Sequence, residues 1–453
     1  MHTLRSTWRG SLGATIAAAG IVAVAVTPVG PYLPLAILAI AYMVWSFPRP
    51  VVAVATIILM NAYVFERSEG ISLLEVGVGV YLYSYLAYWF FVQFFLRRKT
   101  IFRFAVDHLL LAFLIVCALS VVLLLAAQSR TDYWFREGLT MASFLLIFPA
   151  REALRSDRDI AVIFGAFALM VGSLAIVNLV QYRASTLAAN YLWELWGGRK
   201  PFGSAFYASL AVGAISLHAH VQDWRGRWGT LLLAILGALA LGTTFYRGFW
   251  IGAIIGVGVL FLMVSRRGKS RLLWTAVIGG GLAAIALFLI AGDLGTYIME
   301  AFWERLASSG RATGDISIAN RLAESRTVLR IVESSPLVGH GLGVWFSHFN
   351  IITRTTEVVM YVHNMYVYLL LKVGAIGLLL FMGYFLLVVR DGISVSRRGA
   401  ASPLRLAMVR SAVAVMIGFL FVATNSGILQ DKQVILVMVL ATAVITSTPE
   451  TEA

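Results

Sequence analysis

The chain has 453 residues, of which 60% are hydrophobic and only 13% are charged. Soluble domains average about 45–50% apolar and about 25% charged residues, so this composition excludes an ordinary soluble protein. The formal net charge of +14 comes largely from basic residues in short loops between apolar runs, which the positive-inside rule explains without nucleic-acid binding.

Apolar runs close to the length that crosses a bilayer, about 20 residues, recur along the whole chain. We therefore predict an all-α polytopic membrane protein with about 14 transmembrane helices (12–14), in which residues 1–453 form a single transmembrane domain. The predicted spans lie near residues 11–27, 32–47, 51–65, 73–96, 105–127, 137–149, 160–181, 204–220, 230–246, 248–265, 273–292, 362–390, 405–424 and 432–447.

Loops rich in Lys and Arg indicate the orientation of the chain. With the predicted spans, all of them fall on one side of the membrane, which the positive-inside rule makes the cytoplasmic side. These loops are residues 97–103, 151–158, 223–228, 266–271 and 390–405. We therefore expect a multi-pass protein of the inner (plasma) membrane with both termini in the cytoplasm.

One large extracytoplasmic loop, roughly residues 293–361, is the main segment predicted outside the bilayer. Its second half contains a helical pattern over residues 320–335, in which Leu322, Leu329 and Val332 fall near one face and Glu324 falls among the polar positions. Residues 296–307 also have a helical pattern, and the stretch PLVGHGLG (336–343), with its proline and three glycines, should end the second helix.

Polar residues at membrane depth are costly, so those that remain are candidates for function. The predicted spans contain few of them, and no series of Asp, Glu and His runs through successive spans, as a proton-coupled transporter would often need. Polar groups gather instead at the extracytoplasmic ends of the spans. This distribution favours chemistry at the outer membrane face over transport through the membrane.

Three residues at these ends have suitable chemistry: Arg247, in a tight turn between two spans, Arg321, at the start of the predicted loop helix, and His363. A guanidinium offers forked donors that match phosphate oxygens, and a histidine at neutral pH can take a proton from a hydroxyl. Each residue also has an ordinary interpretation, respectively a snorkelling arginine, a solvated charge on a helix face and an interfacial histidine.

Three motifs contain these residues. They are a T-x-x-R-G-x-W stretch from Thr244 to Trp250, Arg321 followed by P-L-x-G-x-G at 336–341, and H-N-x9-G-x-x-G from His363 to Gly377. In these motifs, over residues 230–390, the chain resembles the O-antigen ligase and O-antigen polymerase family of membrane glycosyltransferases. A weaker likeness extends to residues 198–210, where the chain lacks the Pro-Asn pair typical of the family.

The resemblance implies a glycan donor on a polyprenyl diphosphate, a glycan or lipid acceptor with a free hydroxyl, and an inverting transfer that requires no metal or other cofactor. It implies that Arg247 and Arg321 stabilise the departing diphosphate and that His363 is the general base. The remaining candidates would bind substrate; they are Asn364, Lys372, Tyr246, Trp250, Tyr361, Arg199 and Lys200.

The motifs leave several activities open. The first is a ligase that moves a finished glycan onto lipopolysaccharide core, and the second is a polymerase that adds repeat units on the polyprenyl carrier. A protein-directed glycosyltransferase is a third. From a different class, the chain could transport a lipid-linked glycan, although the scarcity of charge within the spans argues against it.

Overall fold

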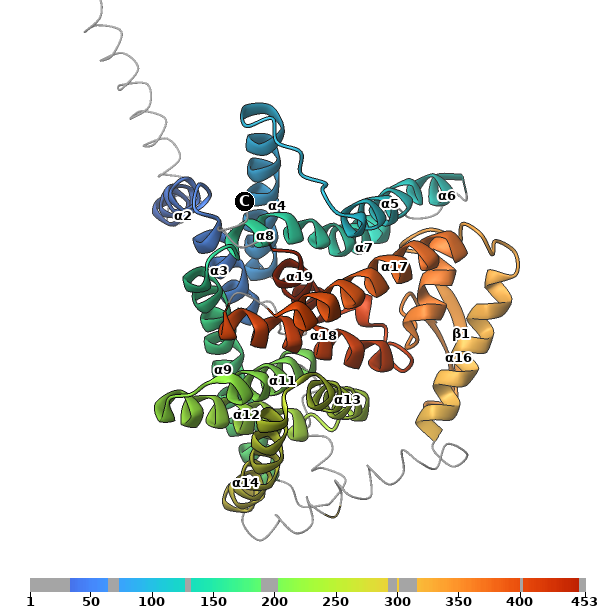
Figure 1. The fold of residues 1–453 in the computed structure, drawn as a ribbon. Helices are drawn as coiled ribbons and strands as arrows, with labels where there is room; N and C mark the ends of the chain where they lie inside the picture. The colour runs from blue at the N-terminus through green and yellow to red at the C-terminus, as the bar shows by residue number, and fades with distance from the viewer. Residues whose placement is uncertain are drawn as a thin grey trace, which may run out of the picture.

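The computed structural model describes residues 33–63, 73–126, 132–188, 203–291, 316–399 and 402–447, together with residue 300. Nearly all of the regular structure in these residues is helical (Figure 1). The helices are α2 (Leu33–Ser46), α3 (Pro50–Met60), α4 (Leu73–Phe91), α5 (Ala105–Leu119), α6 (Val121–Ala126), α7 (Asp132–Ala142), α8 (Ile147–Ala153), α9 (Asp157–Leu187), α11 (Ser204–His220), α12 (Trp224–Thr243), α13 (Arg247–Met263), α14 (Arg266–Ala291), α16 (Ile316–Val332), α17 (Met365–Arg398), α18 (Pro403–Val422) and α19 (Lys432–Thr446).

Most of the predicted apolar spans that the structure describes coincide with helices. The predicted span at 137–149 is instead divided among α7, a 3-10 helix at Ser143–Leu146 and α8. Within the described residues, six helices are long and apolar enough to cross a membrane, which confirms the expectation of a helical membrane protein. They cover Leu74–Leu96, Ala105–Ala126, Asp157–Thr186, Trp224–Thr243, Met365–Arg398 and Pro403–Val422. The predicted helix at 11–27, and that at 296–307 apart from residue 300, lie outside the described residues.

The helices α17 and α18 run side by side through the middle of the molecule, next to α19 (Figure 1). The helices α13 and α18 approach so closely that a Cβ atom added to Gly418 would lie 2.5 Å from the carbonyl oxygen of Gly252. Small residues at such a crossing let two backbones touch, which is a common way to pack helices inside a membrane. This contact fixes α13, and with it Arg247 at its first turn, against α18.

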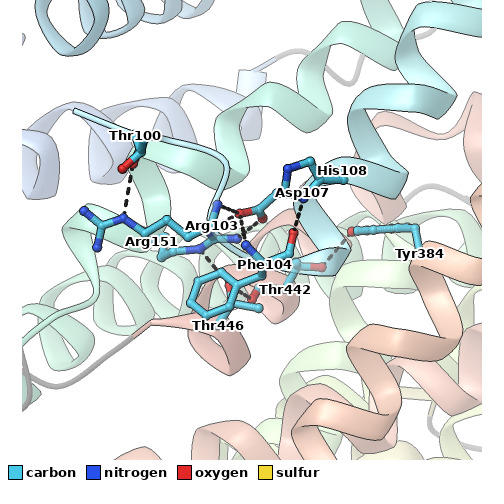
Figure 2. A network of polar contacts seen from close by, with 9 residues as sticks. All are labelled: Thr100, Arg103, Phe104, Asp107, His108, Arg151, Tyr384, Thr442 and Thr446. Carbon is cyan, nitrogen blue, oxygen red and sulfur yellow. Dashed lines mark hydrogen bonds and ion pairs between the residues drawn. The ribbon is translucent and has the colours of Figure 1, made fainter. Parts of the chain in front are cut away.

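A buried ion pair joins α5, α8 and α19 (Figure 2). The Arg151 guanidinium donates to both carboxylate oxygens of Asp107 at 3.0 and 2.6 Å, and to the Thr446 hydroxyl at 2.9 Å. The backbone N–H groups of Arg103 and Phe104 also donate to Asp107, at 2.9 and 3.1 Å. The charges are therefore paired and hydrogen-bonded, as buried charges must be. The pair brings together the predicted cytoplasmic loops 97–103 and 151–158.

A short antiparallel hairpin, β1 (Phe346–Asn350) and β2 (Thr355–Val359), interrupts the otherwise helical architecture. Phe346 pairs with Val359 at its base, and Asn350 pairs with Thr355 next to the turn. The all-α prediction missed this hairpin, because strands of five residues leave too short a pattern to recognise. Hydrogen bonds from Asn350 and Thr353 lower the pKa of Glu357 in β2.

The predicted single span at 362–390 is interrupted, because the backbone of α17 is not helical at Gly374 (φ 64°, ψ −169°). A break in a membrane helix frees backbone groups that must find partners within the protein. Here the turn at 336–341 supplies them. Its N–H groups at His340 and Gly341 donate to the carbonyls of Leu371 and Lys372, at 2.8 and 2.9 Å.

Hydrogen bonds also run in the opposite direction, from α17 to the 336–341 turn. The N–H groups of Ala375 and Ile376, just after the break, donate to the carbonyls of Pro336 and Leu337 at 2.9 and 3.1 Å. The P-L-x-G-x-G and G-x-x-G motifs are therefore two halves of one structural unit. The unit fastens α16, which ends four residues before Pro336, to α17.

We predict that Gly374→Ala lowers the stability of the protein. A positive φ at a residue with a side chain costs about 1–3 kcal/mol, and the new Cβ would lie 2.2 Å from the Leu337 carbonyl oxygen. The control is Gly258→Ala in α13, where a Cβ meets no atom within 4 Å and the helix should gain about 0.5–1 kcal/mol. Equal unfolding temperatures of Gly374→Ala and wild type in detergent would contradict the role of the break.

Candidate active site

His363 lies just before α17 and points to α16. Its Nδ1 atom is 2.7 Å from Oε2 of Glu324, whose side chain is 0% exposed, whereas 35% of the His363 side chain is accessible. An ionised carboxylate can only accept hydrogen bonds. In the neutral ring, Nδ1 therefore bears the proton, and Nε2 is left as the basic atom.

Glu324 belongs to a face of α16 that the sequence analysis assigned wrongly. The residues Asn320, Glu324, Val328 and Val332 are buried, whereas the predicted apolar residues Leu322 and Leu329 are exposed. Spacing alone offered a signal, because these four positions repeat every four residues and share one side of a helix. The glutamate made this spacing hard to recognise as a buried face, because a carboxylate in an amphipathic helix normally lies on the solvated side.

Arg321, one turn before Glu324, donates from Nη1 to the carbonyl of Asn425 at 2.9 Å. Asn425 belongs to the loop Thr424–Ser426 that follows α18, which we call the 424–426 loop. The neighbouring Asn320 accepts a hydrogen bond of 2.8 Å from the backbone N–H of Ile351, in the turn of the hairpin. The start of α16 is thus attached to two other segments of the chain.

The 424–426 loop also contacts the motif that contains Arg247. The hydroxyl of Tyr246 donates to Ser426 Oγ at 2.8 Å, and Arg247 itself is half-buried at the first position of α13. Trp250 is buried, and its indole N–H donates to the carbonyl of Leu241 at 2.8 Å. Trp250 therefore braces the tight turn before α13 from inside the protein, and Tyr246 is the more accessible of the two predicted aromatic contacts.

Asn364 contacts the same loop and begins α17. Its side-chain oxygen accepts from the N–H groups of Tyr366 and Val367 at 3.0 and 3.2 Å, which makes it the N-cap of the helix. Its Nδ2 atom donates to the carbonyl of Thr424 at 3.2 Å. Both ends of the amide are thus engaged in holding the chain next to His363.

Lys372 is placed differently from the other predicted residues. Its fully buried ammonium is 3.1 Å from Oε2 of Glu137 in α7 and donates to the carbonyl of Val344 at 2.9 Å. Glu137 also accepts a short hydrogen bond from the backbone N–H of Gly343. Lys372 and Glu137 thus hold residues 343 and 344, which connect the 336–341 turn to the hairpin. Lys372 could contact a diphosphate only if its buried ion pair with Glu137 opened.

Tyr361 is 44% exposed, and its ring centroid lies 5.3 Å from that of His363 in an edge-to-face arrangement. It is therefore well placed to contact a group that approaches the histidine. Arg199 and Lys200 lie outside the described residues. Within the ranges that are described, no group of three or more His, Cys, Asp or Glu residues is arranged to hold a metal ion.

The structure thus gathers His363, Arg321 and the Tyr246–Arg247 turn around the 424–426 loop. Residues 231–382, from α12 into α17, match a protein-family model described as O-antigen ligase. The matched segment contains Tyr246, Arg247, Arg321 and His363, and also Glu324. No curated protein matches the chain.

Asn364 could act through the N-cap of α17 or through direct contact with substrate. The variants Asn364→Ala, Asn364→Asp and Asn364→Ser separate these two roles. Loss of the N-cap in the alanine variant should cost about 0.5–2 kcal/mol, whereas aspartate and serine should retain most of it. We expect the unfolding temperature and the catalytic activity to recover together in the aspartate and serine variants. Recovery of stability alone would instead assign the amide to substrate binding.

Proposed function

We propose that the chain is a membrane glycosyltransferase of the ligase type, because residues 231–382 match the O-antigen ligase family model. It transfers a glycan from a polyprenyl diphosphate to a hydroxyl of an acceptor at the extracytoplasmic face. The proposed acceptor is lipopolysaccharide core. The observation that supports this function best is the convergence of one accessible histidine and two arginine-containing motifs on the 424–426 loop.

The residues at this loop suit the two demands of the reaction. The leaving diphosphate must have its charge stabilised, and Arg247 and Arg321 offer forked donors for its oxygens. The acceptor hydroxyl must lose a proton, and Nε2 of His363 has no hydrogen-bond partner among the described residues. The proposal assigns the stabilisation of charge to these arginines and requires no bound metal.

In the proposed reaction, the acceptor oxygen attacks the anomeric carbon as its proton passes to Nε2 of His363. The bond between that carbon and the diphosphate oxygen breaks, and its electron pair leaves with the lipid diphosphate. Attack from the face opposite the leaving group inverts the anomeric configuration. Tyr361 and Tyr246 are proposed to contact sugar, while Asn364, Trp250, Lys372, Arg199 and Lys200 remain weaker predictions for substrate binding.

We further propose that the chain crosses the inner membrane fourteen times, within the predicted range of 12–14, as a single transmembrane domain. Residues 293–361 then form an extracytoplasmic loop, and both termini are cytoplasmic. The contact between residues 97–103 and 151–158 around the Asp107–Arg151 pair supports this arrangement, because both segments were predicted on the same side. The site at His363 and the 424–426 loop lies toward the opposite ends of these helices in the proposed topology.

The product of the reaction distinguishes the candidate activities. Purified protein would be incubated with a synthetic polyprenyl-diphosphate glycan and with separate candidate acceptors, and the products sized by gel and mass spectrometry. We expect a single transfer to a lipopolysaccharide core. A ladder of repeats on the polyprenyl carrier would replace the ligase with a polymerase, and movement of intact donor across a vesicle without transfer would indicate a transporter.

The same assay tests the proposed catalytic residues. His363→Ala should lower kcat by about 10²–10⁴-fold, which is the usual contribution of a general base. Arg247→Ala and Arg321→Ala should also abolish transfer, and Arg321→Lys should restore little, because a lysine cannot form a bidentate contact.

Two exposed residues provide matched controls, His108→Ala in α5 and Arg330→Ala in α16. Both should transfer glycan at the rate of the wild type. A variant of His363, Arg247 or Arg321 that is folded, inserted and fully active would remove that residue from the mechanism.

A further inference from the structure

We propose that Glu324 is the positioning residue of His363. Its carboxylate holds the imidazole with a proton on Nδ1, so that Nε2 removes the proton of the acceptor hydroxyl, and it then stabilises the imidazolium that forms. The inference rests on the proposed function, because it assigns Glu324 a task within that transfer.

The geometry favours one tautomer of the ring. Oε2 of Glu324 lies 2.7 Å from Nδ1, a distance typical of a hydrogen bond to a charged group. If Nδ1 lost its proton, its lone pair would face the carboxylate oxygen, and neither acceptor atom would have a hydrogen to share. The basic nitrogen is therefore Nε2, on the side of the ring away from α16.

The burial of Glu324 points to a role that exceeds simple packing. The side chain is 0% exposed, and Oε1 has no hydrogen-bond partner among the described residues. Burying a carboxylate is costly unless a cation or several donors compensate it. In the proposed transfer, the proton that Nε2 accepts gives His363 the positive charge that compensates the carboxylate. The carboxylate thus interacts more strongly with the transition state than with the ground state, which is the condition for catalysis.

Other contacts already perform the structural task of joining α16 to its neighbours. Arg321 is bonded to Asn425, and Asn320 is bonded to the turn of the hairpin. The 336–341 turn fastens the far end of α16 to both sides of the break at Gly374. Because these bonds do not involve Glu324, loss of its charge should leave the helix in place.

The proposed step is balanced in atoms and charge. The acceptor O–H bond breaks, and its proton forms a bond to Nε2 of His363. The oxygen forms the glycosidic bond as the lipid diphosphate leaves with the electron pair of the broken bond. The imidazolium, paired with Glu324, then releases its proton to water, which restores the neutral ring.

The first test uses Glu324→Gln in the full-length protein, with Glu333→Gln, at the exposed residue that follows α16, as the control. The isosteric amide keeps the volume but can present its NH₂ group to Nδ1 and so favour the other tautomer. We expect kcat to fall by about 10²-fold or more, in the range of a lost general base, with KM unchanged. Glu324→Asp should recover part of kcat, since it restores the charge on a shorter side chain, and Glu333→Gln should behave like wild type.

The second test reads the tautomer directly, without any substrate. Protein labelled with ¹⁵N-histidine should show one imidazole protonated at Nδ1 that is absent from His363→Ala. In Glu324→Gln this signal should move toward that of a ring protonated at Nε2. A purely structural role for Glu324 would leave the signal unchanged.

The outcomes separate the two proposals. If wild-type protein transfers glycan and Glu324→Gln has the same kcat, the positioning role is overturned while the proposed function stands. If wild-type protein transfers glycan to no acceptor, the proposed function fails, and the NMR experiment still decides whether Glu324 sets the tautomer. An unchanged tautomer in Glu324→Gln overturns the inference in either case.

Discussion

The 424–426 loop accepts hydrogen bonds from side chains that lie up to 180 residues away in the sequence. Tyr246 binds its last residue, Arg321 its second and Asn364 its first, and each bond belongs to a different motif. Without these bonds, the motifs would be three unrelated segments of a membrane protein. With them, a histidine and two arginines share one neighbourhood at the end of α18. The loop itself contains no residue that the sequence analysis had selected, because its task is to accept bonds rather than to react.

A second constraint lies at Gly374, where two motifs form one unit. A helix that breaks inside a membrane protein must give each freed backbone group a partner, and the 336–341 turn provides four such partners. The spacing of a motif is often attributed to chemistry, but here the glycines allow a backbone geometry that other residues would adopt only with strain. The proposed chemistry depends on these glycines indirectly, since the unit helps to fix the position of α16, which contains Arg321 and Glu324.

Sequence analysis predicted the positions of the described membrane helices well, because each long apolar run has one physical explanation. It also selected His363 and Arg321, since histidine and arginine at a membrane surface suggest specific chemistry. It missed Glu324, because whether a carboxylate in an amphipathic helix is buried depends on a partner 39 residues away. It could not foresee that the Lys372 ammonium pairs with Glu137, which lies far away in the sequence. It also missed the hairpin, because strands of only five residues leave too short a pattern to recognise.

The contact between Gly252 and Gly418 means that the region around α13 and α18 tolerates less change in sequence than the β1–β2 hairpin. Main-chain atoms, rather than side chains, set the distance between α13 and α18, so ordinary substitutions elsewhere have little influence on where Arg247 stands relative to the 424–426 loop. The β1–β2 hairpin has no such restriction on its outward face, where Phe349 and Val358 are exposed. Natural variation or engineering can therefore alter this outer surface, and with it the choice of acceptor in the proposed reaction, while the position of Arg247 next to the 424–426 loop is kept.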